Sequence, residues 1–201
     1  MNLKRIVLAS ASPRRLELLR SLDLQAQVEP SRYGEPDDAS VTPAALATRH
    51  AAAKARDVWA RFPDELIVAA DTVVDVDGKA LGKPRDTGEA VAMLRMLSGR
   101  VHAVHTAIAL AIPGTQELIE DCSTTQVRFY PLGEDEIQEY VRSGEPMDKA
   151  GAYGIQGRAA ALVASIDGDF YTVMGFPLAR FVRALRRLGF TLPAAKSGLN
   201  E

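Results

Sequence analysis

The chain has 201 residues, of which 47% are hydrophobic and 25% are charged, a composition typical of a globular protein with a substantial core. The net charge of −2 excludes the broad basic surface of a nucleic-acid-binding protein, and the single cysteine, Cys122, excludes an internal disulfide. No apolar run approaches the roughly 20 residues of a membrane-spanning helix, and "IVLAS" after Lys4 and Arg5 is too short for a signal peptide. We therefore expect one soluble cytoplasmic domain over residues 1–201 that binds neither membranes nor nucleic acid.

A short strand and a helix are predicted first. Apolar residues 6–9 predict the strand, and Ser12 followed by Pro13 predicts a capped helix start. Leucines then recur at near-helical spacing. Arg14 and Arg15 fall in the first turn of this helix, where the exposed N–H groups disfavour cations. This conflict indicates that the turn binds an anion such as phosphate.

A loop, a long helix and a buried strand are predicted next. Residues 29–40 are polar and rich in turn formers, which predicts the loop. Thr42-Pro43 repeats the cap-plus-proline signature and opens an alanine-rich helix that we expect to run to about residue 62. The apolar run over 66–74, "LIVAADTVV", is typical of a strand covered on both faces, and Asp77-Gly78 predicts a hairpin turn after it.

The second half of the chain is predicted to continue this mixture of elements. Asp86 and Glu89 resemble a capping box, and Pro113-Gly114 predicts the turn of a long hairpin. The expected elements are a helix near 90–97, strands over 101–112 and 117–129, a helix near 134–142, strands over 161–166 and 170–173, a helix from Pro177, and a frayed tail over about 194–201. Helices interspersed with hairpins and single buried strands favour a mixed sheet flanked by helices, which sets a fold class and no function.

Asp71 is the strongest single candidate for a functional residue. It interrupts the apolar strand, where an ionised carboxylate is costly unless it is paired or binds a metal. Acidic residues at strand ends in open α/β sheets often face a ligand crevice. Three interpretations stay open on the residues alone: Asp71 serves a site, Thr72 or a nearby backbone group satisfies the carboxylate structurally, or the strand simply ends there.

The strand-turn-helix at the N-terminus is a candidate anion site. Ser10, Ser12, Arg14 and Arg15 there would offer hydroxyls, backbone N–H groups and fixed cations together. The alternative is a simple serine cap beside solvated arginines. The segment is no Walker A loop, since the glycine spacing and the closing Lys-Ser/Thr are both missing.

Two lysines and a glycine-rich segment are weaker candidates. Lys54 lies on the alanine-rich helix and Lys83 lies after the hairpin, and each could reach a cleft or be solvated. In "DKAGAYGIQG", residues 148–157, glycine recurs every third residue, which permits close approach of a ligand to the backbone. Gln156 in this segment has an amide that both donates and accepts, although a plain irregular loop would also fit.

Four motifs resemble those of the Maf family of nucleoside triphosphate pyrophosphatases. They are "SASPRR" at 10–15, "AADTVV" at 69–74, "GKPRD" at 82–86 and "DKAGAYGIQG" at 148–157. They occur in the family's order and span most of the chain. The last motif is similar to the branch that acts on dTTP and UTP and differs from the branch that acts on 7-methyl-GTP.

The resemblance implies a fold, an assembly and a reaction. The fold would be α/β, with a mixed twisted sheet flanked by helices and two lobes around a cleft, as in Maf and inosine triphosphatase-like proteins. The protein would often be a homodimer. It would hydrolyse a nucleoside triphosphate to the monophosphate and pyrophosphate with a divalent cation, Mg²⁺ or Mn²⁺.

The resemblance also implies roles for individual residues. Asp71 matches the proton acceptor, and a family glutamate that would share the metal falls at Glu35 or a neighbouring acid. The positions linked to substrate choice are Arg14, Thr72 and Gln156. The positions in the phosphate cleft are Ser10, Arg15, Lys54 and Lys83, which Ser12 would join as part of the helix start.

These roles combine into a mechanistic hypothesis. The basic residues would bind the phosphates, and Asp71 with Glu35 would hold the metal and position or deprotonate a water that attacks the α-phosphorus. The amide of Gln156 matches both O4 and N3–H of uracil or thymine, so we expect UTP and dTTP to be favoured over CTP. The competing hypotheses are a non-catalytic nucleotide-binding regulator of cell division and a hydrolase for modified pyrimidine nucleotides.

Overall fold

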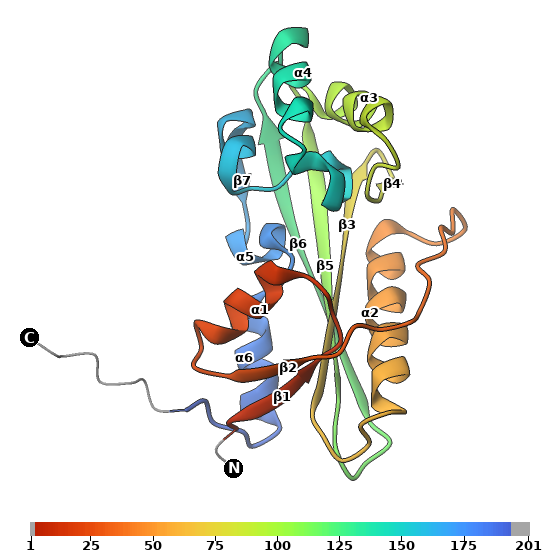
Figure 1. Ribbon diagram of the computed structural model, residues 1–201, viewed down its shortest axis with the longest axis vertical. Helices are drawn as coiled ribbons and strands as arrows, with labels where there is room; N and C mark the ends of the chain where they lie inside the picture. Colours follow the sequence, from red (N-terminus) through yellow and green to blue (C-terminus); the bar gives the residue numbers. More distant parts are fainter. Residues whose placement is uncertain (1–2, 194–201) are drawn as a thin grey trace, which may run out of the picture.

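A mixed sheet runs through the protein, whose computed structural model describes residues 3–193 (Figure 1). The tail predicted over about 194–201 lies outside the described residues. In the described part the seven strands are β1 (Arg5–Leu8), β2 (Gln25–Val28), β3 (Ile67–Val76), β4 (Lys79–Leu81), β5 (Val101–Ala111), β6 (Leu118–Phe129) and β7 (Val163–Asp167). The helices there are α1 (Pro13–Arg20), α2 (Pro43–Trp59), α3 (Thr87–Leu97), α4 (Glu134–Arg142), α5 (Phe170–Met174) and α6 (Leu178–Arg187). Three short 3-10 helices lie between α4 and β7: η1 (Glu145–Asp148), η2 (Ala150–Ala152) and η3 (Gly157–Leu162).

The order of the strands leaves an opening in the sheet. The order is β2-β1-β3-β5-β6-β7, with β1 parallel to β2 and β3 and the later pairs antiparallel. On one edge of β3, β1 pairs only with Ile67 and Val68, whereas β4 pairs with the far end from Val74. Residues 69–73 therefore have no described strand beside them on that edge, and β3 carries Asp71 and Thr72 through this opening.

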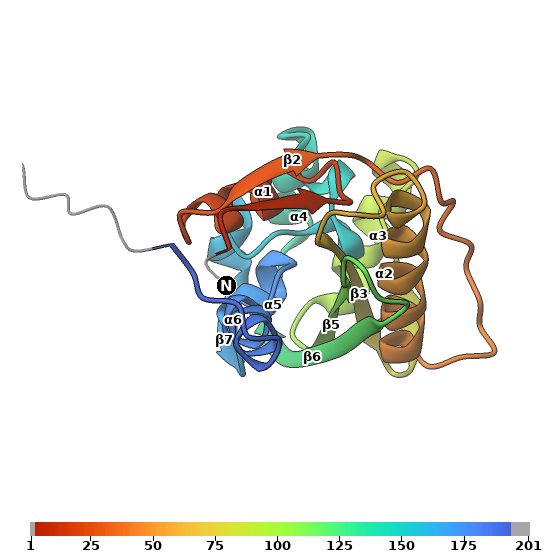
Figure 2. The ribbon, with the colours of Figure 1, turned by 90° about the horizontal axis from the view of Figure 1, so that it is seen from below.

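Three apolar clusters hold the layers together. On one face of the sheet, α2 packs Leu46, Ala51 and Val58 against the alanines of β3 and β5. On the other face lie two further clusters. The first joins α1 and α6 to β1 and to one half of the strands β3 and β5. The second joins α3 and α4 to the other half of β3 and β5. Figure 2 shows α2 on one side of β3 and β5, with α5 and α6 on the other. The two clusters on that second face form the cores of two lobes, which confirms the predicted architecture.

Local sequence signals explain most of the element boundaries. The side chain of Thr42 accepts a hydrogen bond from the N–H of Ala45, and Asp86 accepts one from the N–H of Glu89 at 2.8 Å. In the β3–β4 turn, Asp77 and Gly78 have φ of 53° and 79°, as a primed hairpin turn requires. The predicted loop over 29–40 and the long β5–β6 hairpin are confirmed.

Two predictions near the C-terminal end were wrong, and β2 was not predicted. The strand expected over 170–173 is the short helix α5, because Asp169 caps it by accepting from the N–H of Thr172 and Gly175 ends it at φ 99°. These caps override the strand preference of "FYTV". The start of the strand expected over 161–166 belongs instead to η3, and the strand begins at Val163. Within the described residues, no helix combines the length and apolar character needed to cross a membrane.

Candidate active site

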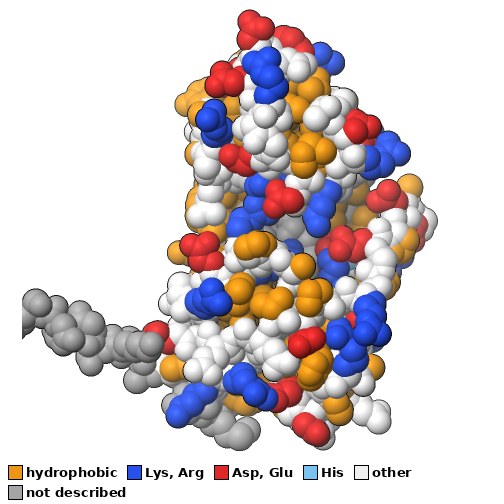
Figure 3. Space-filling model, in the orientation of Figure 1, with side chains coloured by type: hydrophobic (Ala, Val, Ile, Leu, Met, Phe, Trp, Pro, Cys, Tyr) orange, Lys and Arg blue, Asp and Glu red, His pale blue; other side chains and the backbone are white. Residues whose placement is uncertain are grey.

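A cleft of about 650 Å³ lies between the two lobes, at the opening along β3. Figure 3 shows basic and acidic side chains gathered around a hollow between the upper and lower parts of the molecule. The cleft is lined by all of the candidate residues from the sequence: Ser10, Ser12, Arg14, Arg15, Glu35, Lys54, Asp71, Thr72, Lys83 and Gln156. The fold thus brings together residues that lie up to 146 positions apart in the chain, from 10 to 156.

Two carboxylates share one lysine at the centre of the cleft. The Lys54 Nζ atom lies 2.6 Å from Asp71 Oδ1 and 2.7 Å from Glu35 Oε1. The side chains of Asp71 and Lys54 are only 6% and 9% exposed. Asp71 is therefore a buried acid held by a cation from the facing helix α2. This arrangement rules out the alternative that Thr72 satisfies the Asp71 carboxylate, and β3 continues past Asp71 to Val76.

The environment drives the pKa values of the two acids in opposite directions. Burial raises the pKa of Asp71, and the charge and hydrogen bond of Lys54 oppose the rise only in part. For Glu35, partial burial acts to raise the pKa, but the hydrogen bond and charge of Lys54, with help from Lys83, bring it below its usual value. Asp71 is thus the more basic carboxylate of the pair, and Glu35 stays ionised.

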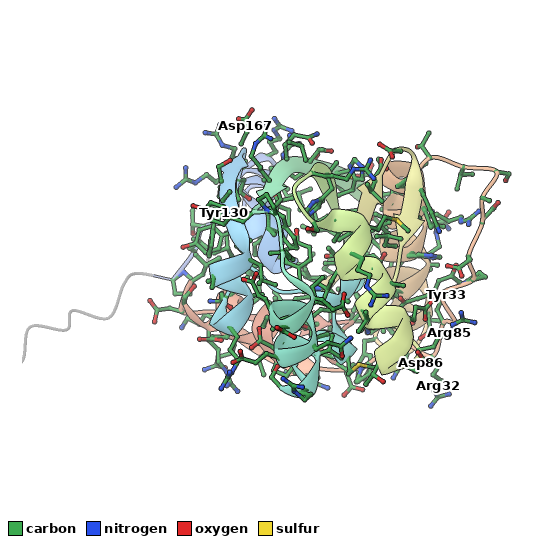
Figure 4. The ribbon with its side chains drawn as sticks, turned by 90° about the horizontal axis from the view of Figure 1, so that it is seen from above. Arg32, Tyr33, Arg85, Asp86, Tyr130 and Asp167 are labelled. Carbon is green, nitrogen blue, oxygen red and sulfur yellow. The ribbon has the colours of Figure 1, made fainter. Side chains whose placement is uncertain are left out.

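The loop that carries Glu35 is fastened to α2. The carboxylate of Asp57 accepts hydrogen bonds from the backbone N–H of Arg32 at 2.9 Å and the hydroxyl of Ser31 at 3.1 Å. The Tyr33 hydroxyl lies 3.1 Å from Nδ1 of His50, one turn before Lys54. Figure 4 shows Arg32 and Tyr33 on the same side of the molecule as Arg85, a residue that precedes α3 in the chain. These contacts place Glu35 over the cleft although its loop has no regular structure.

Arg15 is a half-buried cation held by neutral groups. It donates from Nε to the carbonyl of Gly175 at 2.9 Å, from Nη1 to Ser10 Oγ at 3.0 Å and from Nη2 to Thr72 Oγ1 at 3.3 Å. Burial lowers its pKa, while the nearby carboxylates of Asp71 and Glu35 raise it. Among the described residues no carboxylate lies within 4.0 Å of it. An anion in the cleft would supply the missing opposite charge.

The remaining basic residues are more open to solvent. Arg14 approaches Asp148 at 4.0 Å, and Lys83 is exposed at the cleft edge. Ser12 occupies the N-cap position of α1, but the predicted cap is absent, because its hydroxyl makes no capping hydrogen bond. Its backbone N–H donates to Ser10 Oγ at 3.2 Å instead. The N–H groups of the first turn of α1 therefore lack a side-chain acceptor from Ser12.

The glycine-rich segment forms one wall of the cleft and contains a lysine that sequence reasoning missed. Lys149 is nearly buried, lines the cleft and donates from Nζ to the carbonyl of Glu145 and to Asp148. A Cβ atom at Gly154 would lie 2.8 Å from Cε of Lys149, so this glycine makes room for the lysine stem. Lys149 belongs to the motif at 148–157, and this position was the only feature of the sequence that could have identified it as a cleft residue.

Comparisons with known proteins support a single family. A family model described as Maf-like protein matches residues 5–188. A protein of Symbiobacterium thermophilum named dTTP/UTP pyrophosphatase is 49% identical over 196 residues, covering 98% of this chain and 100% of that protein. Proteins of the same name from Bacillus velezensis and Thermococcus gammatolerans are 49% and 48% identical, over 91% and 92% of this chain and 96% and 97% of theirs.

Solved structures agree on the fold alone. The structure of a HAM1 protein from Coxiella burnetii matches with a TM-score of 0.51 at 16% identity, covering 92% of this chain and 100% of that chain. The Ham1 protein of Staphylococcus aureus matches with a TM-score of 0.50 at 13% identity and the same coverage. The family match and the identity to the named relatives lead to one conclusion: the chain belongs to the Maf family.

Proposed function

We propose that the protein is a nucleoside triphosphate pyrophosphatase that hydrolyses UTP and dTTP to the monophosphate and pyrophosphate. The names of the relatives support this substrate class. The observation that carries the proposal is the buried, lysine-paired Asp71 in the same cleft as Arg15, which has no carboxylate partner among the described residues. A site for binding alone would need the cations and would gain nothing from a buried carboxylate of raised pKa.

The cations of the cleft are suited to a triphosphate, which brings close to four negative charges. In the part of the chain that the structure describes, neither Arg15 nor the first-turn N–H groups of α1 have a carboxylate partner in the cleft, and Arg14 and Lys83 add charge at its edge. Lys54 already contacts two carboxylates, and a contact of its ammonium with phosphate is part of the proposal. Ser10 and Ser12 would contribute hydroxyl groups to the same oxygens.

Asp71 would act as the base toward the attacking water. A general base is most effective when its pKa lies near the working pH, and burial moves the Asp71 pKa in that direction. Glu35, whose pKa is lowered, would remain an acceptor only. This division of roles between two nearby carboxylates with opposed pKa shifts is typical of acid–base sites.

The donor set of the cleft fits a divalent cation such as Mg²⁺ or Mn²⁺. Mg²⁺ is usually held by one or two carboxylates together with substrate phosphates. Asp71 and Glu35 supply two such carboxylates. One oxygen of each already contacts the same positively charged atom, Nζ of Lys54. The described residues contain no group of three or more acidic, His or Cys side chains that would form a complete cage. The bound ion would screen the negative charge of the phosphates.

The test is release of pyrophosphate from UTP in the presence of Mg²⁺. We expect turnover by the wild-type protein and a fall in kcat of about 10²–10⁴-fold in Asp71→Asn, with nucleotide binding largely kept. Asp75→Asn is a matched control, because Asp75 lies on the same strand and pairs with His105 away from this cleft. Near-full activity of Asp71→Asn would remove the assigned base.

The same assay separates the other hypotheses. A non-catalytic regulator would bind UTP without releasing pyrophosphate, and a preference for modified pyrimidine nucleotides would appear in a substrate panel. Equal rates on UTP and CTP would remove Gln156 from base selection. The homodimer and the cytoplasmic location are further parts of the proposal, which sedimentation of the purified protein and cell fractionation would test.

A further inference from the structure

A row of hydroxyl groups crosses the sheet between the cores of the two lobes, and it is partly exposed only at its Thr72 end. Thr72 of β3 lies opposite Thr106 of β5, and Thr106 lies opposite Ser123 of β6. Thr106 and Thr172 of α5 are fully buried. A buried hydroxyl is costly unless it is hydrogen-bonded, so the partners of each group determine where its hydrogen points.

The direction of the hydrogen bonds from Thr72 follows from its neighbours. Thr106 Oγ1 lies 2.7 Å from the carbonyl oxygen of Thr172, which can only accept, so the Thr106 hydrogen lies between these two atoms. Thr72 Oγ1 lies 3.0 Å from Thr106 Oγ1, and this second contact therefore uses the hydrogen of Thr72. With its only hydrogen committed to Thr106, Thr72 can act toward all other groups only as an acceptor.

Thr72 has one lone pair left for a ligand. A hydroxyl oxygen has two, and one of them accepts from Nη2 of Arg15. Thr72 lines the cleft, and Gly175 keeps it open, since a Cβ atom there would lie 3.2 Å from Thr72 Oγ1. An ionised phosphate oxygen cannot donate, so it cannot be the partner of this lone pair. Water or the proposed divalent cation can meet this lone pair, but within the nucleotide itself only the N–H and O–H groups of the nucleoside part can donate to it.

We propose that Thr106 is a positioning residue that fixes Thr72 as an acceptor for the N3–H of uracil or thymine. The inference rests on the proposed function, which supplies the pyrimidine nucleotide. Uracil and thymine have a hydrogen on N3, whereas cytosine has a lone pair there that would face the lone pair of Thr72. The Gln156 amide, in the same cleft, would then donate to O4. Thr106 thus acts on base selection without touching the substrate.

The test compares Thr106→Val with Thr106→Ser. Valine keeps the shape of the side chain and loses the hydroxyl, so the Thr72 hydrogen becomes free to point at cytosine N3. We expect the UTP:CTP ratio of kcat/KM to fall by about tenfold or more in Thr106→Val and to stay near the wild-type value in Thr106→Ser. The ratio does not depend on the fraction of folded enzyme, so a purely structural role would not move it.

Thr125→Val is the matched control. Thr125 is also a fully buried threonine of the same sheet, but its hydroxyl bonds to the backbone of Asp169 and not to Thr72. We expect this variant to lose stability and to keep the wild-type UTP:CTP ratio. A fall in its ratio equal to that of Thr106→Val would overturn the proposal, because any loosening of the sheet would then suffice.

Two further measurements separate this inference from the proposed function. The ratio of dissociation constants for UMP and CMP tests base selection without turnover, so it remains decisive if wild-type protein does not hydrolyse UTP. An unchanged ratio in Thr106→Val, or no binding of UMP by the wild-type protein, overturns the role of Thr106. A shift in the UTP:dUTP ratio instead would place Thr72 against the 2′-hydroxyl and also overturn it.

Discussion

Lys54 shows how much one residue decides in this cleft. A lysine on an alanine-rich helix is usually solvated, but the 17-residue helix α2 packs flat against the sheet and turns this lysine inward. Its ammonium meets Asp71 and Glu35, so two carboxylates are tolerated close together in a nearly buried place. The ammonium of Lys54 therefore favours the ionised form of both acids before any substrate enters.

Replacing Lys54 should change the pH dependence of catalysis. Burial raises the pKa of Asp71, and Lys54 opposes that rise, so Lys54→Met should raise the pKa further. Because the base form of Asp71 exists above its pKa, the acid limb of kcat/KM against pH should move to higher pH. Arg56→Met is the control, since Arg56 is an exposed residue of the same helix that pairs with Glu120. An acid limb that stays in place would show that Lys54 does not set the Asp71 pKa.

Among the elements, the glycine-rich wall of the cleft is built by two kinds of close approach. Gly151 has φ of +66°, and a Cβ atom on it would lie 2.9 Å from Cγ2 of Val74 in β3. At Gly154 the neighbour is the flexible stem of Lys149. The first glycine lets the wall pack on the sheet, and the second leaves space for a side chain of the cleft.

Alanine at these two glycines should therefore have different effects. Gly151→Ala combines a strained φ with a clash in the core and should lower the free energy of unfolding by about 2–3 kcal/mol. Gly154→Ala should displace Lys149, raise KM for UTP and cost less than about 1 kcal/mol of stability. Gly144→Ala, at φ +75° with no atom within 4 Å, isolates the cost of the backbone angle. Denaturant unfolding and steady-state kinetics on all three variants distinguish these effects, and equal stability losses at 151 and 144 would contradict the packing argument.

At the scale of the whole molecule, two lobes share one sheet, and each has its own apolar core. The histidine His102 lies in one of these cores. His102 is 2% exposed, with Nε2 2.7 Å from the Tyr153 hydroxyl and an edge-on contact with Phe129. Its Nδ1 atom is buried and has no hydrogen-bond partner within residues 3–193. Burial lowers the pKa of His102 from 6.5 to about 4, so the folded protein resists its protonation.

Acid should therefore destabilise the fold through His102. Below pH 6.5 the unfolded chain binds a proton at this residue, while the folded chain does so only near pH 4, so stability falls as the pH drops through this window. The expected loss is on the order of 3 kcal/mol. His102→Gln should show a shallower fall in unfolding free energy between these pH values, whereas Tyr153→Phe, which removes the hydrogen bond and keeps the histidine, should retain the slope. The same slope in His102→Gln and wild type would assign the acid lability to other groups.

The sequence by itself determined the elements whose signals are local. Caps at Thr42 and Asp86, the turn at Asp77-Gly78 and the apolar run around Asp71 each depend on neighbouring residues in the chain, and each predicted its element correctly. Every candidate residue that the sequence singled out lies in one cleft. The strand β2 and the helix α5 were harder, because a four-residue polar strand and a five-residue aromatic helix have little periodicity to detect.

Only the tertiary structure decided how the candidates meet. The direction of Asp71 toward Lys54, and of Thr72 toward Arg15 on the opposite face of β3, follows from register and helix packing over long separations. The opening beside residues 69–73 exists because β1 and β4 pair with different ends of one strand. Hydrogen-bond directions, pKa shifts and cleft shape all arise from groups distant in sequence, so no local pattern encodes them.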